Sequence, residues 1–546
     1  MNLAAARLWT TGLQCWAMSV TAPFRPPHGQ KTRTTLGRTE TGGVLVASPV
    51  GDGHAPMPCG RGSIERSPEG SSAGALWRFL AIAAAGLVAR AAIAAQFPVH
   101  FDEAYYWVWA HRPDWGYVDQ PPMIAYLIML TTHLGDAPFW VRFSPLLMGP
   151  ITSYVLFLLG REMFDDRVGL RAAALFQIVP ILMFGGLIAA PDAPLYLAWV
   201  LALRFSWQAI HGRPTRWAAV GLAMGLGVLS KFSMLGLAVG VILYTALEAR
   251  PWLRRNEPYQ AALLALVLLL PVAYWNVHHD WASLRFVLYD RPRPDVGLAG
   301  FQAFWLTLPY LLFLTPVYVW SFRTMLLRLG DERFRYLFWT TLPAVVVPLL
   351  VAPLGIARGH WWGPVYLELA IVVAALWNRF SAAMAVCNAS VLVWTTATVL
   401  LGLPRVPPLS SLYYLYGWNE VAQRVERELA EVGGGAVVVT DHYDIASALS
   451  YYGRLKFPVL LAGSTDPAAV WPRFADVQGS NGVGVTYAAY PWHRCFRRSV
   501  EAPPQTAQLD RQLHVFRLYD LFASCSDHDG AESSHRNFDE ASGMIR

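Results

Sequence analysis

Charged residues are scarce in this sequence. Asp, Glu, Lys and Arg together make up 15% of its 546 residues, whereas hydrophobic residues make up 55%. The mean hydropathy is +0.33. Soluble globular chains typically carry about 25% charged residues, so this deficit excludes an ordinary soluble protein and indicates a membrane protein.

Cysteine-based and nucleotide-binding motifs are also missing. The chain has 5 cysteines without a Cys-x-x-Cys pair, and it contains neither a Walker loop nor Gly-x-Gly-x-x-Gly. Nucleotide hydrolysis and a Rossmann cofactor are therefore unsupported. Cys387 lies in an apolar run, where it serves as a small apolar residue. Cys495 and Cys525 lie in the C-terminal region and are candidates for a disulfide in an oxidising compartment.

Apolar segments long enough to cross a bilayer, about 20 residues each, recur between residues 75 and 403. A polar break at 230–233 favours two spans over one long helix in the region 216–249. The run 121–135 is too short to span comfortably, so we expect it to lie along the membrane surface. The predicted spans are 75–96, 139–160, 168–188, 191–211, 216–231, 233–249, 259–276, 301–323, 335–355, 362–378 and 381–402.

Arginines are concentrated in alternate loops between these spans. The positive-inside rule makes those loops cytoplasmic and places the N-terminus inside. The net charge of +6 therefore reflects topology and does not indicate nucleic-acid binding. The loop arginines are Arg161, Arg167, Arg171, Arg213, Arg216, Arg250, Arg254, Arg255, Arg323, Arg328, Arg333, Arg335 and Arg379.

The opposite loops hold most of the remaining ionisable residues. The same rule places them on the outer face of a cytoplasmic (inner) membrane, which is the periplasmic side in a cell with two membranes. A collection on one face indicates a site, although loops are polar in general. These residues are Asp102, Glu103, His111, Asp119, Asp192, Lys231, His278, His279, Asp280, Arg291, Arg293, Arg358 and His360.

The two ends of the chain differ from the middle. Residues 1–74 are rich in Gly, Pro, Ser, Thr and Arg, so we expect a disordered or mis-assigned leader before a transmembrane domain at 75–403. Beyond it, 404–525 predicts a small α/β extracytoplasmic domain, followed by a disordered tail at 526–546. The elements expected in the small domain are helices at 418–432 and 445–452 and strands at 436–440, 459–462, 482–487 and 513–519.

The first outer loop carries two acidic motifs rich in aromatic residues. Residues 101–107 are Phe-Asp-Glu-Ala-Tyr-Tyr-Trp, and residues 115–122 are Trp-Gly-Tyr-Val-Asp-Gln-Pro-Pro. Carboxylates are expensive in lipid, so Asp102, Glu103 and Asp119 must face water, protein or a ligand. Carboxylates at a bilayer surface indicate chemistry on a lipid-borne substrate.

These motifs resemble the first outer loop of GT-C superfamily glycosyltransferases, which use polyprenyl-phosphate sugars. The superfamily includes the protein O-mannosyltransferases and the aminoarabinose transferase of lipid A. Ala-Pro-Asp-Ala-Pro-Leu at 190–195 is similar to their second acidic motif, and Leu-Ser-Lys-Phe at 229–232 is similar to a later motif with a lysine. Together with the spans, the resemblance predicts a multi-pass α-helical membrane protein of about 11 helices with a small C-terminal α/β domain.

The resemblance implies a transferase that moves a sugar from a polyprenyl phosphate to an acceptor on the outer face, normally with inversion. The acceptor would be lipid A or core, an envelope glycan or a protein. Such a reaction needs a base, and Asp102 matches the catalytic Asp of the family. Glu103 is assigned either a catalytic role or a structural hydrogen bond, because helical neighbours do not face the same way.

Asp192 is the next predicted catalytic residue. From local sequence alone, an N-cap of the following span is the better interpretation, whereas the family match favours the site, and both roles are compatible. Asp119 has the same ambiguity, because Pro121-Pro122 also suits a turn or a helix start. Tyr105 and Tyr106 belong to the first motif and are assigned to substrate binding with Asp119.

The leaving phosphate needs positive charge or hydrogen-bond donors. Many relatives carry Lys or His at the position of Gln120, so this chain departs from the pattern with a neutral donor. We therefore expect Lys231, Arg358 or His360 to supply the charge, with Lys231 favoured by its motif and Arg358 by its capacity for bidentate bonds. The alternative for Lys231 is snorkelling to the interface.

No cofactor is predicted. A divalent metal lacks a clear ligand set, since the adjacent His278 and His279 cannot easily share one ligand face. In 441–443, Asp441 capping a strand-to-helix turn is preferred over catalysis. The alternative function is a multi-pass transporter or flippase of envelope glycolipids, which should show related halves, and no repeat is evident.

Overall fold

The computed structural model describes residues 69–286, 316–354, 359–403, 415–462, 471–472, 474–487, 491–502 and 513–522, and this part is mostly helical. The helices before residue 404 are α2 (Glu69–Gln96), α3 (Phe101–Ala110), α4 (Met123–Thr132), α5 (Pro138–Val141), α6 (Phe143–Met163), α7 (Asp166–Ile178), α8 (Pro180–Gly185), α9 (Asp192–Ile210), α10 (Arg216–Ser230), α11 (Met234–Leu247), η1 (Arg250–Arg254), α12 (Glu257–His278), α13 (Ala282–Arg285), α16 (Pro316–Leu326), α17 (Glu332–Val351), η3 (Ala352–Leu354), η4 (Gly359–Trp362), α18 (Gly363–Ala375) and α19 (Arg379–Leu400).

Five segments of the described chain are long and apolar enough to cross a membrane: 73–96, 143–163, 257–278, 332–354 and 379–400. Shorter apolar helices include α4, which has 10 residues and a length of only about 15 Å. The predicted polar break is confirmed, because α10 ends at Ser230 and α11 begins at Met234.

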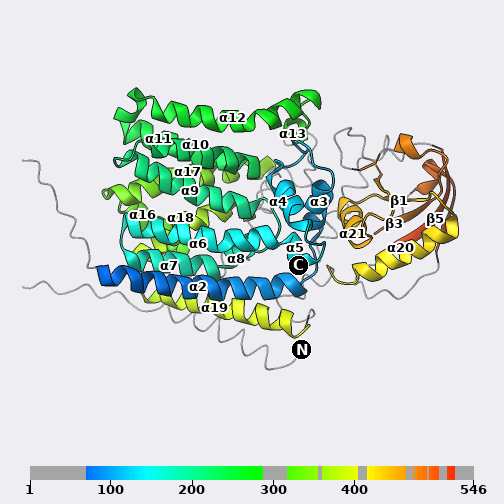
Figure 1. The fold of residues 1–546 in the computed structure, drawn as a ribbon, viewed down its shortest axis with the longest axis horizontal. Coiled ribbons are helices and arrows are strands. Elements are labelled where there is room, and N and C mark those ends of the chain that lie inside the picture. The colour runs from blue at the N-terminus through cyan, green and yellow to red at the C-terminus, as the bar shows by residue number, and fades with distance from the viewer. Residues whose placement is uncertain are drawn as a thin grey trace, which may run out of the picture. The chain divides into compact units, whose positions relative to one another are not determined.

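The long helices pack side by side (Figure 1). Helix α10 lies between α9 and α12, α6 packs against α7 and α9, and α11 packs against α17. Gly221 of α10 lies against the backbone of Ala261, and Gly240 of α11 lies against Thr340, so a side chain at either glycine would collide with the neighbouring helix. Small residues therefore set the close helix approaches, as is usual in membranes.

The predicted span at 168–188 is not one helix. Helix α7 ends before Val179, which is extended, and Pro180 starts the short α8. Arg90 of α2 is buried beside this break and donates from Nε to the Met183 carbonyl at 3.2 Å and from Nη2 to the Phe176 carbonyl at 3.4 Å. The Phe176 carbonyl has no helical partner, because Pro180, four residues later, lacks an N–H, whereas the Met183 carbonyl also accepts from the Gly186 N–H at 3.2 Å.

After residue 415, the described chain forms a five-stranded sheet with two α-helices. The strands follow the order β2-β1-β3-β5-β4, and β1 pairs parallel with β2 and β3, whereas β5 pairs antiparallel with β3 and β4. The elements are α20 (Trp418–Val432), β1 (Val437–Thr440), α21 (Tyr443–Tyr452), β2 (Val459–Leu461), η6 (Phe474–Val477), β3 (Gly482–Thr486), η7 (Trp492–Arg494), β4 (Phe496–Glu501) and β5 (His514–Leu521).

Helix α21 joins this sheet to the helical part by packing on α3 (Figure 1). The Tyr451 hydroxyl donates to the Asp136 carbonyl at 2.7 Å, and Trp107 packs edge-on against Tyr451. One apolar cluster therefore contains residues of α3, α20, α21 and the sheet. This packing holds the start of α21 over α3.

Strand β4 is a strand that the sequence analysis missed. Only Phe496 of its six residues is buried, so the strand lacks the alternation that marks a half-buried strand. Cys495, just before it, is buried and disulfide-bonded, and its partner is not among the described residues; Cys525 lies outside them.

Candidate active site

Helix α3 begins at the first acidic motif because His100 caps it. The His100 ring nitrogen accepts from the Asp102 N–H at 3.2 Å, and the Glu103 carboxylate accepts from the His100 N–H at 2.9 Å. This reciprocal capping box fixes where the helix starts. It points the two neighbouring carboxylates in different directions, since Asp102 is 47% exposed and Glu103 is fully buried.

Asp102 faces the small α/β part of the chain. The Tyr443 hydroxyl, at the start of α21, donates to Asp102 Oδ1 at 3.3 Å. The pKa of Tyr443 is raised well above its ordinary value by the negative charge of Asp102 and by burial, so the hydroxyl keeps its proton. Asp102 is thus an open carboxylate with one neutral donor held beside it.

Three of the predicted carboxylates gather around Tyr106. Burial raises the pKa of Tyr106 well above 10.0, and the charges of Asp102, Asp119 and Asp192 raise it further. Asp119 also raises the pKa of Tyr443. Asp102, Asp119 and Asp192 therefore all lie within electrostatic reach of Tyr106, and we refer to these three residues as the acidic cluster.

Among the described residues with a predicted site role, Lys231 is the cation that pairs with the acidic cluster. Lys231 Nζ lies 2.9 Å from Asp192 Oδ1 and 3.0 Å from Oδ2, and both side chains are largely buried. The snorkelling interpretation of Lys231 does not fit this pairing. The N-cap interpretation of Asp192 is wrong, because Pro191 occupies the N-cap of α9 without a side-chain hydrogen bond.

Glu103 lies in a buried ion pair. Arg142 donates from Nε to Glu103 Oε1 at 2.7 Å and from Nη2 to Oε2, and the Ala189 N–H donates to Oε1 at 2.8 Å. Burial raises the pKa of Glu103, but the Arg142 charge and these hydrogen-bond donors outweigh it, so the pKa is lowered overall. The carboxylate ties α3 to the turn that leads to Asp192.

Arg142 extends the same connection to the end of α2. Its Nη1 donates to the carbonyls of Ala94 at 3.2 Å and Phe97 at 2.8 Å, and its Nη2 donates to that of Pro98 at 2.7 Å. The sequence analysis missed this arginine, since it lies at the edge of an apolar run. The only local signal is a lone charge there, which can be paired or exposed.

Aromatic rings form one wall beside Asp102. Tyr105 packs edge-on against Tyr443 with ring centroids 5.9 Å apart, and against Trp109 at 4.8 Å. It also stacks on Trp471, with ring centroids 6.2 Å apart and an interplanar angle of 20°. For 441–443 the sequence analysis preferred a turn capped by Asp441 over a catalytic role. The structure has His442 as the N-cap of α21, so the prediction that Asp441 caps this helix is wrong.

The structure gives less detail on the remaining predicted site residues. Gln120 is half-buried next to Asp119. Arg358 lies outside the described residues, and His360 lies in η4 before α18 with a side chain that is also outside them. Each ring of His278 and His279 bonds its own helix backbone four residues earlier. Within the described ranges, no three His, Cys, Asp or Glu side chains are grouped to hold a metal ion.

The sequence of this chain is similar to those of known glycosyltransferases. The family model for dolichyl-phosphate-mannose-protein mannosyltransferases matches residues 119–275. The lipid A galacturonosyltransferase RgtD of Rhizobium johnstonii is 25% identical over 365 residues, which cover 64% of this chain and 76% of the relative. The chain is therefore similar to glycosyltransferases of the GT-C superfamily.

Further similar proteins are also named as transferases or share the fold. An undecaprenyl phosphate-alpha-4-amino-4-deoxy-L-arabinose arabinosyl transferase of Pectobacterium atrosepticum is 26% identical over 298 residues, or 49% of this chain and 51% of the relative. The crystal structure of apo ArnT from Cupriavidus metallidurans has the same fold, with a TM-score of 0.56 and 16% identity over 82% of this chain and 98% of that one. The same protein bound to undecaprenyl phosphate gives a TM-score of 0.56 at 15% identity over the same shares.

These relatives and the apolar helices make the chain a multi-pass membrane glycosyltransferase. The transporter alternative receives no support from them, because the relatives are named as transferases.

Proposed function

We propose that this enzyme transfers a sugar from a polyprenyl-phosphate donor to an acceptor at the outer surface of the cytoplasmic membrane. The observation that supports it most is the acidic cluster around Tyr106, with Lys231 paired to one of its members. The acidic cluster and Lys231 together offer both a base and a cation at the membrane surface. Relatives named as lipid A and undecaprenyl-phosphate sugar transferases support the substrate class.

In the proposed reaction, Asp102 is the base. An acceptor hydroxyl oxygen attacks the anomeric carbon of the donor, and its proton passes to the Asp102 carboxylate. The bond between the anomeric carbon and the phosphate oxygen breaks, its electron pair stays on the phosphate, and the polyprenyl phosphate leaves. The exposure of Asp102 and its neutral donor Tyr443 suit this role.

Lys231 is proposed to meet the leaving phosphate, and Asp192 to hold the ammonium group in place. The pair is largely buried, where charges interact more strongly than in water. Arg358 and His360 stay candidates for additional charge at the same phosphate. Tyr105, Tyr106, Asp119 and Gln120 line the approach as substrate-contacting residues.

Glu103 is proposed as a positioning residue. Its four hydrogen-bond donors and full burial leave no face for a substrate. Its bonds to Arg142 and to the Ala189 N–H set the spacing between Asp102 and Asp192. Catalysis by Glu103 itself is thus the weaker of the two roles.

The proposed topology has about 11 spans, which places the α/β domain at 404–525 on the outer side. It rests on the alternation of arginine-rich loops. Reporter fusions after Val432 should be active only when exported, and a cytoplasmic signal there would remove both the topology and the outer-face site.

The proposed activity is tested by reconstituting the full chain in nanodiscs with a radiolabelled polyprenyl-phosphate sugar and lipid A. Label that moves covalently onto the acceptor supports the proposal. Label that crosses the bilayer of proteoliposomes while it stays on the polyprenyl phosphate would support a flippase instead.

A further inference from the structure

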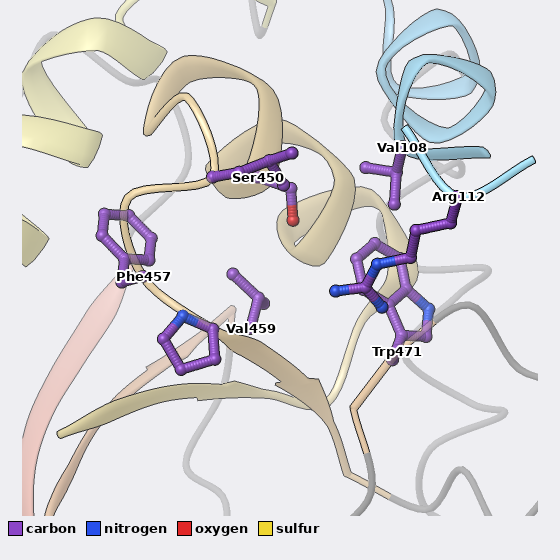
Figure 2. Close-up of a pocket in the computed structure, with 8 residues that line it drawn as sticks. Val108, Arg112, Ser450, Phe457, Val459 and Trp471 are labelled. Atoms are coloured by element: carbon purple, nitrogen blue, oxygen red, sulfur yellow. The ribbon is translucent and has the colours of Figure 1, made fainter. Parts of the chain in front are cut away.

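One loop without regular secondary structure carries two of the proposed substrate contacts. It consists of residues 114–120, lies between α3 and α4, and includes Asp119 and Gln120. Figure 2 shows Arg112 just after the end of α3, from where the chain runs on into this loop. Because α3 carries Asp102, the contacts of the 114–120 loop decide where its residues lie relative to the proposed base.

Asp114 anchors the start of this loop to two helices. Its Oδ2 accepts from Trp275 Nε1 at 3.0 Å, in the last turn of α12, and its Oδ1 accepts from the Trp115 N–H at 2.7 Å. The Asp114 carbonyl accepts from the hydroxyl of Tyr126, in α4, at 2.6 Å. One residue therefore connects the loop to both α12 and α4.

The Trp275 ring is a fixed surface for the loop. It is 3% exposed and stacks on His279, with ring centroids 4.2 Å apart. A Cβ at Gly116 would lie 2.9 Å from two atoms of the Trp275 ring, so only glycine allows the loop backbone to come this close. The Trp275 side chain thus holds the loop by its ring face and by its N–H.

A second hydrogen bond joins the loop to α13. The Ser283 hydroxyl donates to the Tyr117 carbonyl at 2.8 Å, and the Ser283 N–H donates to Asn276 Oδ1 at 3.2 Å. On the opposite side, the Tyr117 ring stacks on Trp109 of α3, with centroids 4.0 Å apart and an interplanar angle of 7°. The loop is therefore clamped between α3 and the end of α12.

These contacts are close enough to the substrate residues to set their positions. Asp119 and Gln120 follow Tyr117 by two and three residues, at most about 10 Å of extended chain. Misplacing a group that contacts the substrate by about 1 Å can cost about 10²-fold in rate. Asp114 itself is exposed, so its carboxylate places the loop and does not belong to the core.

We propose that Asp114 and Trp275 are positioning residues of the transferase, because their hydrogen bond holds the 114–120 loop where Asp119 and Gln120 contact the donor. The proposal rests on the proposed function above and adds two residues to it. Both act through the loop and not on the substrate directly.

The first test is sugar transfer by the full chain carrying Trp275→Phe in nanodiscs, measured over a range of donor concentrations. Phenylalanine lacks the indole N–H but keeps an aromatic ring against Gly116. We expect the donor KM to rise about fivefold, as for one lost hydrogen bond, and the acceptor KM to stay unchanged. A variant that only unfolds more easily would lower the apparent kcat and leave both KM values unchanged.

Substitutions of Asp114 test the other partner of the bond. Asp114→Ala should raise the donor KM by a similar factor, and Asp114→Asn should raise it less, because the amide oxygen still accepts from Trp275 Nε1. Combining Asp114→Ala with Trp275→Phe should raise the donor KM no further than the stronger single change, since both remove one bond. Independent increases that multiply would overturn the proposal.

The matched control is Trp252→Phe, which removes an indole N–H near the opposite end of α12. Trp252 Nε1 donates to the Ile210 carbonyl at 3.3 Å. This variant also loses one hydrogen bond of a tryptophan, but far along the chain from the 114–120 loop. Its donor KM should equal that of the unchanged protein, and a rise as large as in Trp275→Phe would overturn the positioning role.

Hydrogen exchange followed by mass spectrometry reads the loop without any turnover. In nanodiscs, the backbone amides of residues 115–120 should exchange about tenfold faster in Trp275→Phe than in the unchanged protein or in Trp252→Phe, as for a lost hydrogen bond to a charged group. Faster exchange with an unaltered donor KM would overturn the proposal, as would unaltered exchange. Absence of transfer by the unchanged protein would instead refute the proposed function and the positioning role with it, whatever the exchange rates.

Discussion

Replacing Glu103 with Gln should destabilise the protein although the side chain keeps its size. Glutamine has one oxygen for the Ala189 N–H and Arg142 Nε, but its amide nitrogen would face Arg142 Nη2 and the His100 N–H, which are themselves donors. Breaking a buried pair by removing one partner costs about 3–5 kcal/mol. Three backbone carbonyls still bind Arg142, so we expect the lower end, about 3 kcal/mol.

The assay is equilibrium denaturant unfolding of the purified protein in detergent. Glu426→Gln is the matched control, because Glu426 pairs with the exposed Lys456 on the surface. An exposed pair contributes at most about 1 kcal/mol. If Glu103→Gln were as stable as Glu426→Gln, the buried pair would not hold α3 to the Asp192 turn, and the positioning role would be refuted.

The same variant has a pH signature. The pKa of Glu103 is held below its ordinary value of 4.5, so the stabilisation is complete above pH 4.5 and is lost as the pH falls through the lowered value. The stability difference between the unchanged protein and Glu103→Gln should therefore shrink in strong acid. A difference that stays constant over that range would contradict the ion-pair explanation.

Two further predictions concern the residues around Asp102 and Asp192. Tyr443→Phe removes the hydroxyl that donates to Asp102. This change should lower kcat/KM for transfer about tenfold, as expected for the loss of a hydrogen bond to a charged group. An unchanged kcat/KM would show that the 3.3 Å hydrogen bond has no role in transfer. Lys231→Ala should raise the KM for the polyprenyl-phosphate donor. Adding Gln120→Lys to this variant should lower the donor KM part of the way back if both positions face one phosphate. Titration of the donor at fixed acceptor measures both values, and an unaltered donor KM in Lys231→Ala would exclude Lys231 from the phosphate site.

Local sequence patterns predicted the elements with strong periodicity or clear breaks. Helix α20 has the bounds expected from its amphipathic pattern, 418–432, and the polar stretch at 230–233 separates two helices as expected. These features depend on side chains close together in the chain. The helix break at Pro180 was not predicted, because it lies in an otherwise apolar run. Strand β4 was not predicted, because it is exposed at the edge of the sheet.

The site residues were found by motif, whereas their relations required the fold. No local signal pairs Asp192 with Lys231, or Glu103 with Arg142, because each pair is 39 residues apart. The N-cap interpretation of Asp192 failed because Pro191 occupies the N-cap and Asp192 is the first residue of α9, where its carboxylate pairs with Lys231. Tyr443 reaches Asp102 across 341 residues, and only the packing of α21 on α3 brings it there.

The central claim is that Asp102 takes the proton of the acceptor during sugar transfer. The most direct test is the rate of radiolabel transfer from a polyprenyl-phosphate sugar in nanodiscs by Asp102→Asn and by the unchanged protein. Loss of a general base lowers the rate by about 10²–10⁴-fold, and Asn keeps the shape of an exposed side chain, so we predict a rate reduced at least about 10²-fold in a protein of unchanged stability. A folded Asp102→Asn protein that transfers sugar at the unchanged rate would contradict the account.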